Sequence, residues 1–311
     1  MFSLICAQGL TKRYGDKLAL DGACFAIEEG QVVGLLGLNG AGKSTTMNIL
    51  TGCISATAGT VAIGGYDIAT HPRQAKRITG YLPEQPAFYP EMKVRDHLNF
   101  VCGLKGLPAV GRKKHIDHIC GLVGLEDMLG RMVRNLSKGY RQRLGFAQAL
   151  VGDPKVIILD EPTVGLDPSQ IIEIRRLIKD SGQRATVIVS SHILSEIQAV
   201  CDRVIMLQKG RVIADCPTNE MVGRASIRVR VQGEAEVIGA ALHKVPGMGS
   251  VKQLGQNEPG TWDFALESAG GSDIRPAVFR ALAAADLPLL AAHSADISLE
   301  EAFLHLTGGA T

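Results

Sequence analysis

The positions of hydrophobic side chains predict strands of two kinds in the first part of the chain. Residues 4–27 alternate between apolar and polar side chains on either side of a turn at Gly15 and Asp16, which predicts an antiparallel pair of strands. Other short runs are apolar at every position and predict strands buried on both faces, as in a parallel sheet. These runs are residues 32–36, 156–159 and 187–189.

Segments with helical spacing, in which apolar residues recur every three or four positions, separate these strands. Residues 94–129 have this spacing, with a break at Gly106-Leu107-Pro108, and so do residues 171–178. Asp167 followed by Pro168 is typical of a helix start, because the carboxylate accepts free backbone N–H groups and proline fits the first helical position. The interleaved strands and helices predict an α/β fold.

The pattern changes near residue 224, where we place a domain boundary. Residues 227–231 and 262–267 alternate, which predicts two strands that each have one buried face. We therefore expect a first domain over residues 1–224 and a small C-terminal α/β (α+β) domain over residues 225–311. One helix expected in the second domain is marked by an apolar stripe of Ile274, Val278, Ala281 and Leu282. A second helix is expected at residues 299–306, where Ser298 and Glu301 form a capping box.

Composition narrows the class of protein. The 311 residues include 33 Lys and Arg against 31 Asp and Glu, a net charge of +2, so we expect no nucleic-acid partner. The seven cysteines are scattered and never in C-x-x-C spacing, which argues against a zinc site and favours a reducing compartment. No apolar segment approaches the roughly 18 to 20 residues that cross a bilayer, and the first residues lack signal-peptide features, so we expect a cytoplasmic protein.

A glycine-rich segment between a predicted strand and a predicted helix indicates a phosphate-binding loop. Gly37, Gly42, Lys43 and Ser44 match the spacing G-x-x-x-x-G-K-[ST], in which backbone N–H groups turn toward an anion. Lys43 would neutralise the outer phosphates, and the Ser44 hydroxyl is a hard ligand for Mg²⁺. The nucleotide-binding residues expected in this loop are Gly37, Leu38, Asn39, Gly40, Ala41, Gly42, Lys43, Ser44 and Thr45.

Acidic and imidazole side chains follow two of the fully apolar runs. Asp160 and Glu161 come directly after residues 156–159, and His192 follows residues 187–189 after two serines. The carboxyl ends of parallel strands meet at one edge of a sheet, where α/β proteins bind their ligands. The pattern therefore predicts that these three side chains lie together.

A second loop, Leu136-Ser137-Lys138-Gly139-Tyr140, precedes an apolar helix for which Ser137 is a suitable N-cap. With this loop included, the chain resembles the nucleotide-binding subunits of ATP-binding cassette (ABC) transporters, whose LSGGQ signature corresponds to it, although Lys138 and Tyr140 differ from the common form. The resemblance covers residue 4 to about residue 224. It implies ATPase activity and a P-loop NTPase fold with a mixed-sheet core, an antiparallel β subdomain and a helical subdomain at about residues 90–150.

The resemblance also implies roles for single residues. Tyr14 corresponds to the aromatic residue that stacks on adenine, and Asp160 to the acid that holds Mg²⁺ together with Ser44. Glu161 corresponds to the general base that polarises the attacking water. His192 corresponds to the histidine that contacts the γ-phosphate and orients this water.

The same resemblance implies two subunits that face each other head to tail, with a second copy of this chain as the expected partner. The signature loop of one subunit then reaches the ATP bound to the other, and Asp167 lies in the D-loop at the junction. The residues expected to contact the opposite subunit's ATP are Ser137, Lys138, Gly139 and Tyr140.

One position departs from the family's pattern in a way that affects the site. The Q-loop glutamine should follow Tyr81 by three residues, but Glu84 stands there and Gln85 is its neighbour. Either Glu84 approaches the metal shell, where its charge would tighten metal and repel phosphate, or Gln85 shifts into the site as a metal ligand. The sequence leaves both alternatives open.

The function implied by the resemblance is that of an ATP-hydrolysing subunit that drives separate membrane-spanning permease subunits from the cytoplasmic face of the inner membrane. Export is implied by the C-terminal appendage and by the tail Leu299-Glu300-Glu301-Ala302-Phe303, which is similar to tails of exporter-associated ATPases. The alternative function is a soluble ABC-type ATPase that acts as a regulator or in a nucleic-acid-associated machine. A third interpretation makes the C-terminal domain a ligand sensor or dimer clamp.

The basic cluster Arg112-Lys113-Lys114-His115 has two interpretations. A run of charges on a helix is usually its solvated face. The alternative is a contact with membrane headgroups or with a cytoplasmic loop of a membrane partner.

Overall fold

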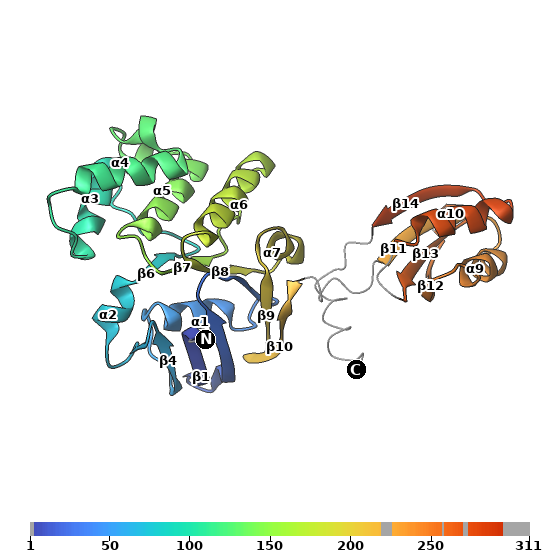
Figure 1. Cartoon of the computed structure of the whole chain (residues 1–311), viewed down its shortest axis with the longest axis horizontal. Helices are drawn as coiled ribbons and strands as arrows, with labels where there is room; N and C mark the ends of the chain where they lie inside the picture. The colour runs from blue at the N-terminus through green and yellow to red at the C-terminus, as the bar shows by residue number, and fades with distance from the viewer. Residues whose placement is uncertain (1–2, 219–225, 257, 270–272, 295–311) are drawn as a thin grey trace. The chain divides into compact units, whose positions relative to one another are not determined.

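The computed structural model describes residues 3–218, 226–256, 258–269 and 273–294 and divides the chain into two compact units (Figure 1). The units comprise residues 1–218 and 219–311, so the division lies slightly before the boundary expected at residue 224. The helix predicted at residues 299–306 and the tail at residues 299–303 lie outside the described residues.

The first unit begins with a four-stranded antiparallel sheet. Its strand order is β2-β1-β4-β5, and the turn predicted at Gly15 and Asp16 joins β1 to β2, which pair from Ser3 with Glu28 to Tyr14 with Lys17. The alternating pattern at residues 4–27 is thus confirmed as an antiparallel pair. The strands are β1 (Ser3–Tyr14), β2 (Lys17–Glu28), β4 (Ala58–Ile63) and β5 (Tyr66–Asp67).

A six-stranded mixed sheet, with order β10-β9-β3-β8-β7-β6, forms the centre of this unit. Five strands are parallel and β10 runs antiparallel at one edge. All five residues of β3 and of β7 are buried, as their apolar sequences predict. The strands are β3 (Val32–Leu36), β6 (Thr79–Leu82), β7 (Val156–Asp160), β8 (Thr186–Ser191), β9 (Arg203–Gln208) and β10 (Arg211–Pro217).

Helices cover both faces of the mixed sheet. Helix α1 (Lys43–Leu50) lies between the two sheets, where Met47 and Leu50 enter the core, while α5 (Lys138–Leu150), α6 (Pro168–Gly182) and α7 (Leu194–Val200) lie on the opposite face (Figure 1). Two further helices, α3 (Val94–Leu104) and α4 (Arg112–Val123), pack against α5. This arrangement exposes the carboxyl ends of the parallel strands, where the predicted site residues lie.

One short helix was not predicted from the sequence. Helix α2 (Pro72–Arg77) buries only Ala75, so it has no apolar stripe to detect. Single 3₁₀ turns at Glu126–Met128 and Val133–Asn135 complete the segment between α4 and α5.

The second unit is a four-stranded antiparallel sheet with two helices, which agrees with the expected small α+β fold. Its strand order is β12-β13-β11-β14, and the predicted strands at residues 227–231 and 262–267 are its central pair. The edge strands β12 and β14 were not predicted, because β12 alternates little between buried and exposed residues. The elements are β11 (Ser226–Gln232), α9 (Ala235–His243), β12 (Met248–Gly255), β13 (Thr261–Ser268), α10 (Arg275–Ala284) and β14 (Leu289–Ser294).

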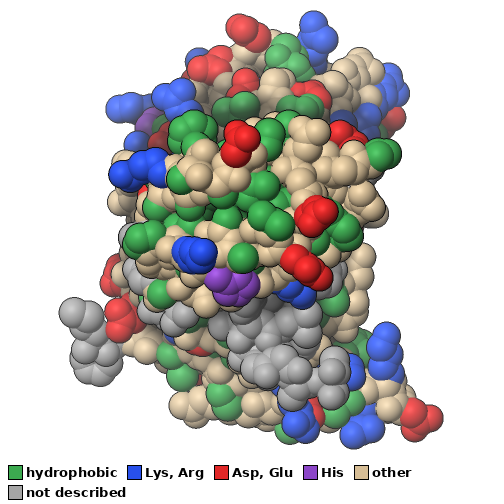
Figure 2. Space-filling model, turned by 90° about the vertical axis from the view of Figure 1, so that its right-hand side faces the viewer, with side chains coloured by type: hydrophobic (Ala, Val, Ile, Leu, Met, Phe, Trp, Pro, Cys, Tyr) green, Lys and Arg blue, Asp and Glu red, His purple; other side chains and the backbone are tan. Residues whose placement is uncertain are grey.

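The core of the second unit forms where apolar residues of its central strands meet those of its helices, among them Val229, Phe264, Ile238 and Leu282. On the face drawn in Figure 2, hydrophobic side chains lie among acidic and basic ones. Among the described residues of this unit, the large hydrophobic ones that remain exposed are Val237, Leu254, Phe279 and Leu290. Across the described ranges, no helix combines the length and the apolar character needed to span a membrane.

Candidate active site

A cavity of about 550 Å³ lies where the phosphate-binding loop faces the ends of β7 and β8. Most of the lining residues were predicted from the sequence as parts of one site, namely the glycine-rich loop, Tyr14, Glu161 and His192. The lining residues are Tyr14, Lys17, Ala19, Asn39, Gly40, Gly42, Lys43, Ser44, Thr45, Glu84, Glu161, Val164 and His192.

Two glycines of the loop, Gly37 and Gly42, are required by the close approach of other backbone. Gly42 has a φ of 111°, and a Cβ there would lie 2.8 Å from the carbonyl oxygen of Ala19. A Cβ at Gly37 would lie 2.5 Å from the carbonyl oxygen of Leu207. No other residue could therefore occupy these two positions without moving the neighbouring strands.

Lys43 begins α1 and points back across the loop. Its side chain is only 6% exposed, and Nζ donates a 2.8 Å hydrogen bond to the carbonyl oxygen of Gly37. The same Nζ lies 3.5 Å from Oε1 of Glu161. A buried ammonium group needs such partners, so in this structure Glu161 supplies the negative charge next to Lys43.

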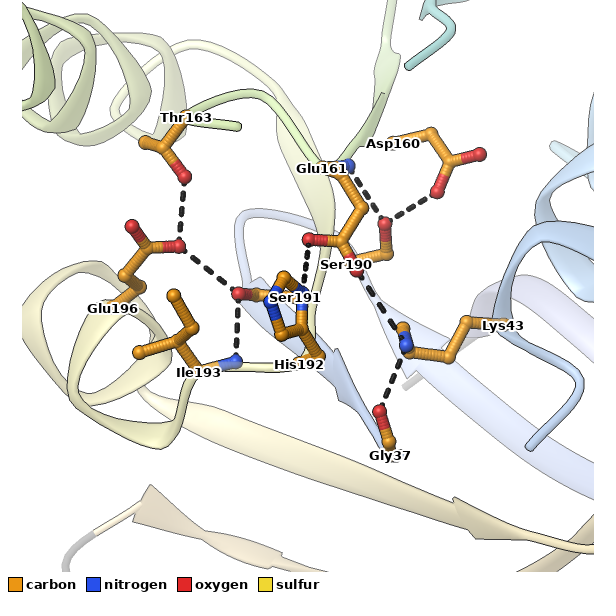
Figure 3. A network of polar contacts seen from close by, with 10 residues as sticks. All are labelled: Gly37, Lys43, Asp160, Glu161, Thr163, Ser190, Ser191, His192, Ile193 and Glu196. Atoms are coloured by element: carbon orange, nitrogen blue, oxygen red, sulfur yellow. Dashed lines mark hydrogen bonds and ion pairs between the residues drawn. The ribbon is translucent and has the colours of Figure 1, made fainter. Parts of the chain in front are cut away.

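Glu161 lies between a lysine and a histidine at the rim of the cavity (Figure 3). Its second oxygen, Oε2, is 2.9 Å from Nδ1 of His192. Its backbone φ is 48°, a left-handed conformation that is uncommon for residues other than glycine. This turn at the end of β7 directs the carboxylate into the cavity, whereas the preceding residue, Asp160, is 3% exposed and is not among the lining residues.

Ser190 joins the two acidic residues. Its Oγ donates a 2.5 Å hydrogen bond to Oδ1 of Asp160 and accepts a 2.9 Å hydrogen bond from the backbone N–H of Glu161. Ser190 and Asp160 are register partners in the parallel pair β7 and β8, which explains how a residue 30 positions away reaches both.

A second set of hydrogen bonds connects the segment after Glu161 with the segment around His192 (Figure 3). Oε2 of Glu196 accepts hydrogen bonds from the hydroxyl groups of Thr163, at 2.7 Å, and Ser191, at 3.0 Å. The Ser191 hydroxyl in turn accepts a 3.0 Å hydrogen bond from the backbone N–H of Ile193. The two loops that carry the candidate base and histidine are thereby held together.

The two residues considered for the Q-loop differ in their positions. Both are exposed, but Glu84 lines the cavity together with Lys43 and Ser44, whereas Gln85 is not among the lining residues. The carboxylate alternative is the one that the cavity geometry favours.

The predicted signature loop does not contribute to the cavity of its own chain, because none of its five residues is among the lining residues. Ser137 is the N-cap of α5 and accepts a hydrogen bond from the backbone N–H of Tyr140. Nζ of Lys138 lies so near Gly165 that a Cβ added there would overlap it, and a Cβ on Gly139 would lie 2.5 Å from the Gln170 side chain.

Asp167 has a local structural role that the sequence predicted. Its Oδ1 accepts hydrogen bonds from the Ser169 hydroxyl and from the backbone N–H of Gln170, so it caps α6. The Ser169 hydroxyl, followed by the Gln170 N–H, lowers the pKa of Asp167 below its usual value of 3.8.

Several cavity and network residues were missed by sequence reasoning. Lys17 and Ala19 line the cavity because β2 runs back beside Tyr14. Val164 lines it because the chain turns after Glu161. Ser190 carried a signal that could have been used, since a hydroxyl at the end of a buried strand requires a polar partner. Thr163 and Glu196 carried none.

The oxygen atoms available in the site suit Mg²⁺. Ser44 and Asp160 offer hydroxyl and carboxylate oxygens, the hard donors that Mg²⁺ prefers. In the parts of the chain that the structure describes, no three His, Cys, Asp or Glu side chains are grouped to hold a metal ion. Mg²⁺ is usually bound by one or two protein groups together with substrate phosphates and water.

Comparison with known proteins identifies relatives of this chain. The sequence pattern of the family described as "ABC transporter" matches residues 20–164. The linearmycin resistance ATP-binding protein LnrL of Bacillus subtilis is 30% identical over 312 residues, which cover 98% of this chain and 98% of that protein. The Nod factor export ATP-binding protein I of Ralstonia nicotianae is 36% identical over 222 residues, 70% of this chain and 68% of that protein.

The fold also matches a solved structure. The ATP-binding cassette MJ0796, solved as a dimer in a post-hydrolysis state with ADP and phosphate, superposes with a TM-score of 0.63 and 25% identity. The match covers 69% of this chain and 98% of that protein.

Proposed function

This chain belongs to the ABC transporter family and is an ATPase, and from that premise we propose that two copies bind ATP with Mg²⁺ between them and drive membrane-spanning subunits of an exporter. The observation that carries the proposal is the position of Glu161 at the cavity, between Lys43 and His192. This arrangement supplies a base, a cation for phosphate and an orienting imidazole in one place.

In the proposed reaction, Glu161 accepts a proton from the water that attacks the terminal phosphoryl group of ATP. His192, hydrogen bonded to Glu161, orients this carboxylate, and Lys43 exchanges its contact with Glu161 for the outer phosphates. Tyr14, which is half exposed at the cavity, is available to stack on adenine.

Ser44, which lines the cavity, and Asp160, which ends β7 directly before the lining residue Glu161, are the residues that we propose to hold Mg²⁺. Glu84, in place of the expected glutamine, also lines the cavity. The ion would neutralise charge on the phosphates as the bond to the leaving group breaks. Gln85 lies outside the cavity lining, which argues against its having this role.

The site of one chain lacks the signature loop, which supports a site built from two chains. Ser137 and Gly139 lie at the N-terminus of α5, where free N–H groups can bind an anion supplied by another subunit. The relative MJ0796 has been solved as a dimer, which supports the same arrangement here. Turnover would then require two chains.

A mixing experiment tests this two-chain site. Lys43→Ala removes the phosphate-binding cation, and Ser137→Asp keeps an N-cap acceptor while it places negative charge where the phosphate is expected. Each variant alone should be inactive, whereas their mixture should recover up to about a quarter of the parent ATPase rate, because a mixed dimer has one intact site. A mixture as inactive as its components would contradict the proposal.

The relatives support export as the function of the complex. The names of two of them refer to Nod factor export and to linearmycin resistance.

A basic groove in this chain supports a site for the membrane partner. The groove has a volume of about 660 Å³, and its lining includes Arg73, Lys76, Arg77, Val101, Leu104 and Lys105.

The groove suits a partner segment that combines acidic and apolar side chains. Leu104 is 71% exposed within it, and Lys105 bonds the backbone carbonyl groups of Lys76, at 2.8 Å, and Thr79. Burial lowers the pKa of Lys105 to about 8, so this lysine is still largely charged at neutral pH. We therefore propose that an acidic cytoplasmic loop of the membrane subunit binds here.

Charge reversal tests the groove. Arg77→Glu should abolish co-purification with the proposed membrane subunit, while the exposed Lys179→Glu on α6 should leave it unchanged. If Arg77→Glu instead loses binding to anionic vesicles and still binds the membrane subunit, the groove is a site for lipid headgroups. The cluster at residues 112–115 is a weaker candidate, because Arg112 bonds the carbonyl of Leu107 and His115 accepts the N–H of Gly152.

A further inference from the structure

Ser190 is buried at the end of β8 and is not part of the cavity lining, yet its hydroxyl contacts both acidic residues of the site. The Oγ proton is used in the 2.5 Å hydrogen bond to Oδ1 of Asp160. A lone pair of Oγ accepts the backbone N–H of Glu161 at 2.9 Å. One hydroxyl therefore satisfies an acceptor and a donor in a fully buried position.

The contact with Glu161 occurs at a residue whose backbone conformation is unfavourable. Glu161 has a φ of 48°, a left-handed conformation that a residue other than glycine keeps only where the surrounding structure stabilises it. The hydrogen bond from the Glu161 N–H to Ser190 comes from the neighbouring strand and stabilises this turn. The turn directs the carboxylate toward Lys43 and His192.

The contact with Asp160 restricts the orientation of the other acid. Hydrogen bonding of Oδ1 to Ser190 limits rotation of the Asp160 carboxylate and leaves Oδ2 outside this hydrogen bond. An acid that binds a cation needs this restriction, because residues that orient a ligand commonly change metal affinity by tenfold or more when they are removed. The two contacts connect the orientation of both acids to one side chain.

We propose that Ser190 is a positioning residue of the ATPase, which holds Asp160 oriented toward Mg²⁺ and holds the backbone turn that presents Glu161 to water. The inference rests on the proposed function. Ser190 acts only through the two acids, since it is not a lining residue of the cavity. Its loss should weaken metal binding and slow turnover, and it should leave the affinity for metal-free nucleotide unchanged.

Two substitutions of nearly equal shape separate the hydroxyl from packing. Ser190→Thr keeps the hydroxyl and Ser190→Val replaces it with a methyl group, and both β-branched residues suit a strand. Mn²⁺, as a paramagnetic substitute for Mg²⁺, would be titrated by EPR into the full chain saturated with a non-hydrolysable ATP analogue. Steady-state ATPase rates and thermal unfolding would be measured on the same samples.

We expect Ser190→Thr to bind Mn²⁺ like the parent, and Ser190→Val to bind it about tenfold more weakly, with kcat lowered at least tenfold and KM for ATP little changed. Ser181→Ala is the matched control, because Ser181 is buried in α6 and its hydroxyl bonds only the local carbonyl of Leu177. It should alter stability alone.

Equal Mn²⁺ affinity and equal kcat for the two Ser190 variants would overturn the inference, whatever their stability. If Ser190→Val does not fold, Ser190→Ala compared with Ser190→Thr decides the same question. A parent chain that binds the nucleotide analogue but hydrolyses no ATP would overturn the proposed function itself. An active parent with indistinguishable variants would overturn only the role of Ser190.

Discussion

His192 Nδ1 lies 2.9 Å from Oε2 of Glu161, although the two residues belong to the ends of different strands. Because a carboxylate oxygen can only accept a hydrogen bond, the contact at this distance requires the tautomer in which Nδ1 carries the hydrogen and is the donor. The other oxygen of Glu161 faces Lys43. A carboxylate held on both sides in this way has a defined direction, which a general base needs.

Removal of the imidazole should affect turnover more than binding. In His192→Ala, Glu161 loses its orienting hydrogen bond, and we expect kcat to fall about 10- to 100-fold with little change in KM for ATP. Phosphate release under steady-state conditions measures both constants. His243→Ala is the control, because His243 bonds a local backbone carbonyl in the second unit, and it should match the parent. An unchanged kcat in His192→Ala would contradict the proposed role.

Neutralising Glu161, the proposed base, should slow ATP hydrolysis without weakening ATP binding. We expect Glu161→Gln to lower the ATPase rate by about 10² to 10⁴, since general-base catalysis is typically of this size. ATP affinity should stay the same or rise, because Lys43 loses a competing carboxylate at 3.5 Å. Single-turnover hydrolysis and titration with a fluorescent ATP analogue measure the two effects. The exposed Glu29→Gln serves as control, and parent-like hydrolysis by Glu161→Gln would show that another residue is the base.

Loss of the loop lysine should prevent binding. Lys43→Ala removes a charge-assisted contact with phosphate, so we expect ATP affinity to fall about a hundredfold or more. Equilibrium titration with the same fluorescent analogue measures this. The exposed Lys179→Ala on α6 should bind as the parent does. Unchanged affinity in Lys43→Ala would refute the assignment of the phosphate-binding loop.

The cap of α6 should make a pH-dependent contribution to stability. Because the pKa of Asp167 is lowered in the folded chain, its contribution is fully present above the unfolded value of 3.8 and is lost as the pH falls through the folded pKa. Asp167→Ala should therefore reduce the unfolding free energy at pH 7, and its difference from the parent should shrink below pH 3.8.

Urea unfolding at a series of pH values measures this difference. Asp167→Asn keeps a hydrogen-bond acceptor without a titrating group, so its stability relative to Asp167→Ala should not depend on this pKa. Asp180→Ala, on the same helix, controls for the loss of a surface charge. A parent-to-Ala difference that is constant with pH would exclude the cap carboxylate as its source.

Local sequence pattern was sufficient to predict much of the fold and the position of the candidate phosphate-binding loop between β3 and α1. The spacing of Gly37, Gly42 and Lys43 specifies a turn into a helix, and a run of apolar residues before Asp160 specifies a buried strand. The edge strand β12 was missed because its burial does not alternate from residue to residue. Periodicity cannot detect an element that has no continuous buried face.

The amino-acid sequence by itself determined which residues are predicted to carry chemistry, because the residue types and spacings typical of phosphate binding and water activation are local properties of the chain. Only the tertiary structure decided which of them meet. The register of β7 against β8 places Ser190 beside Asp160, and the packing of the loop places Lys43 beside Glu161. The choice of Glu84 over Gln85 depends in the same way on which side chain faces the cavity. Such contacts join distant segments, and their distances follow from strand pairing and packing, which no short stretch of sequence specifies.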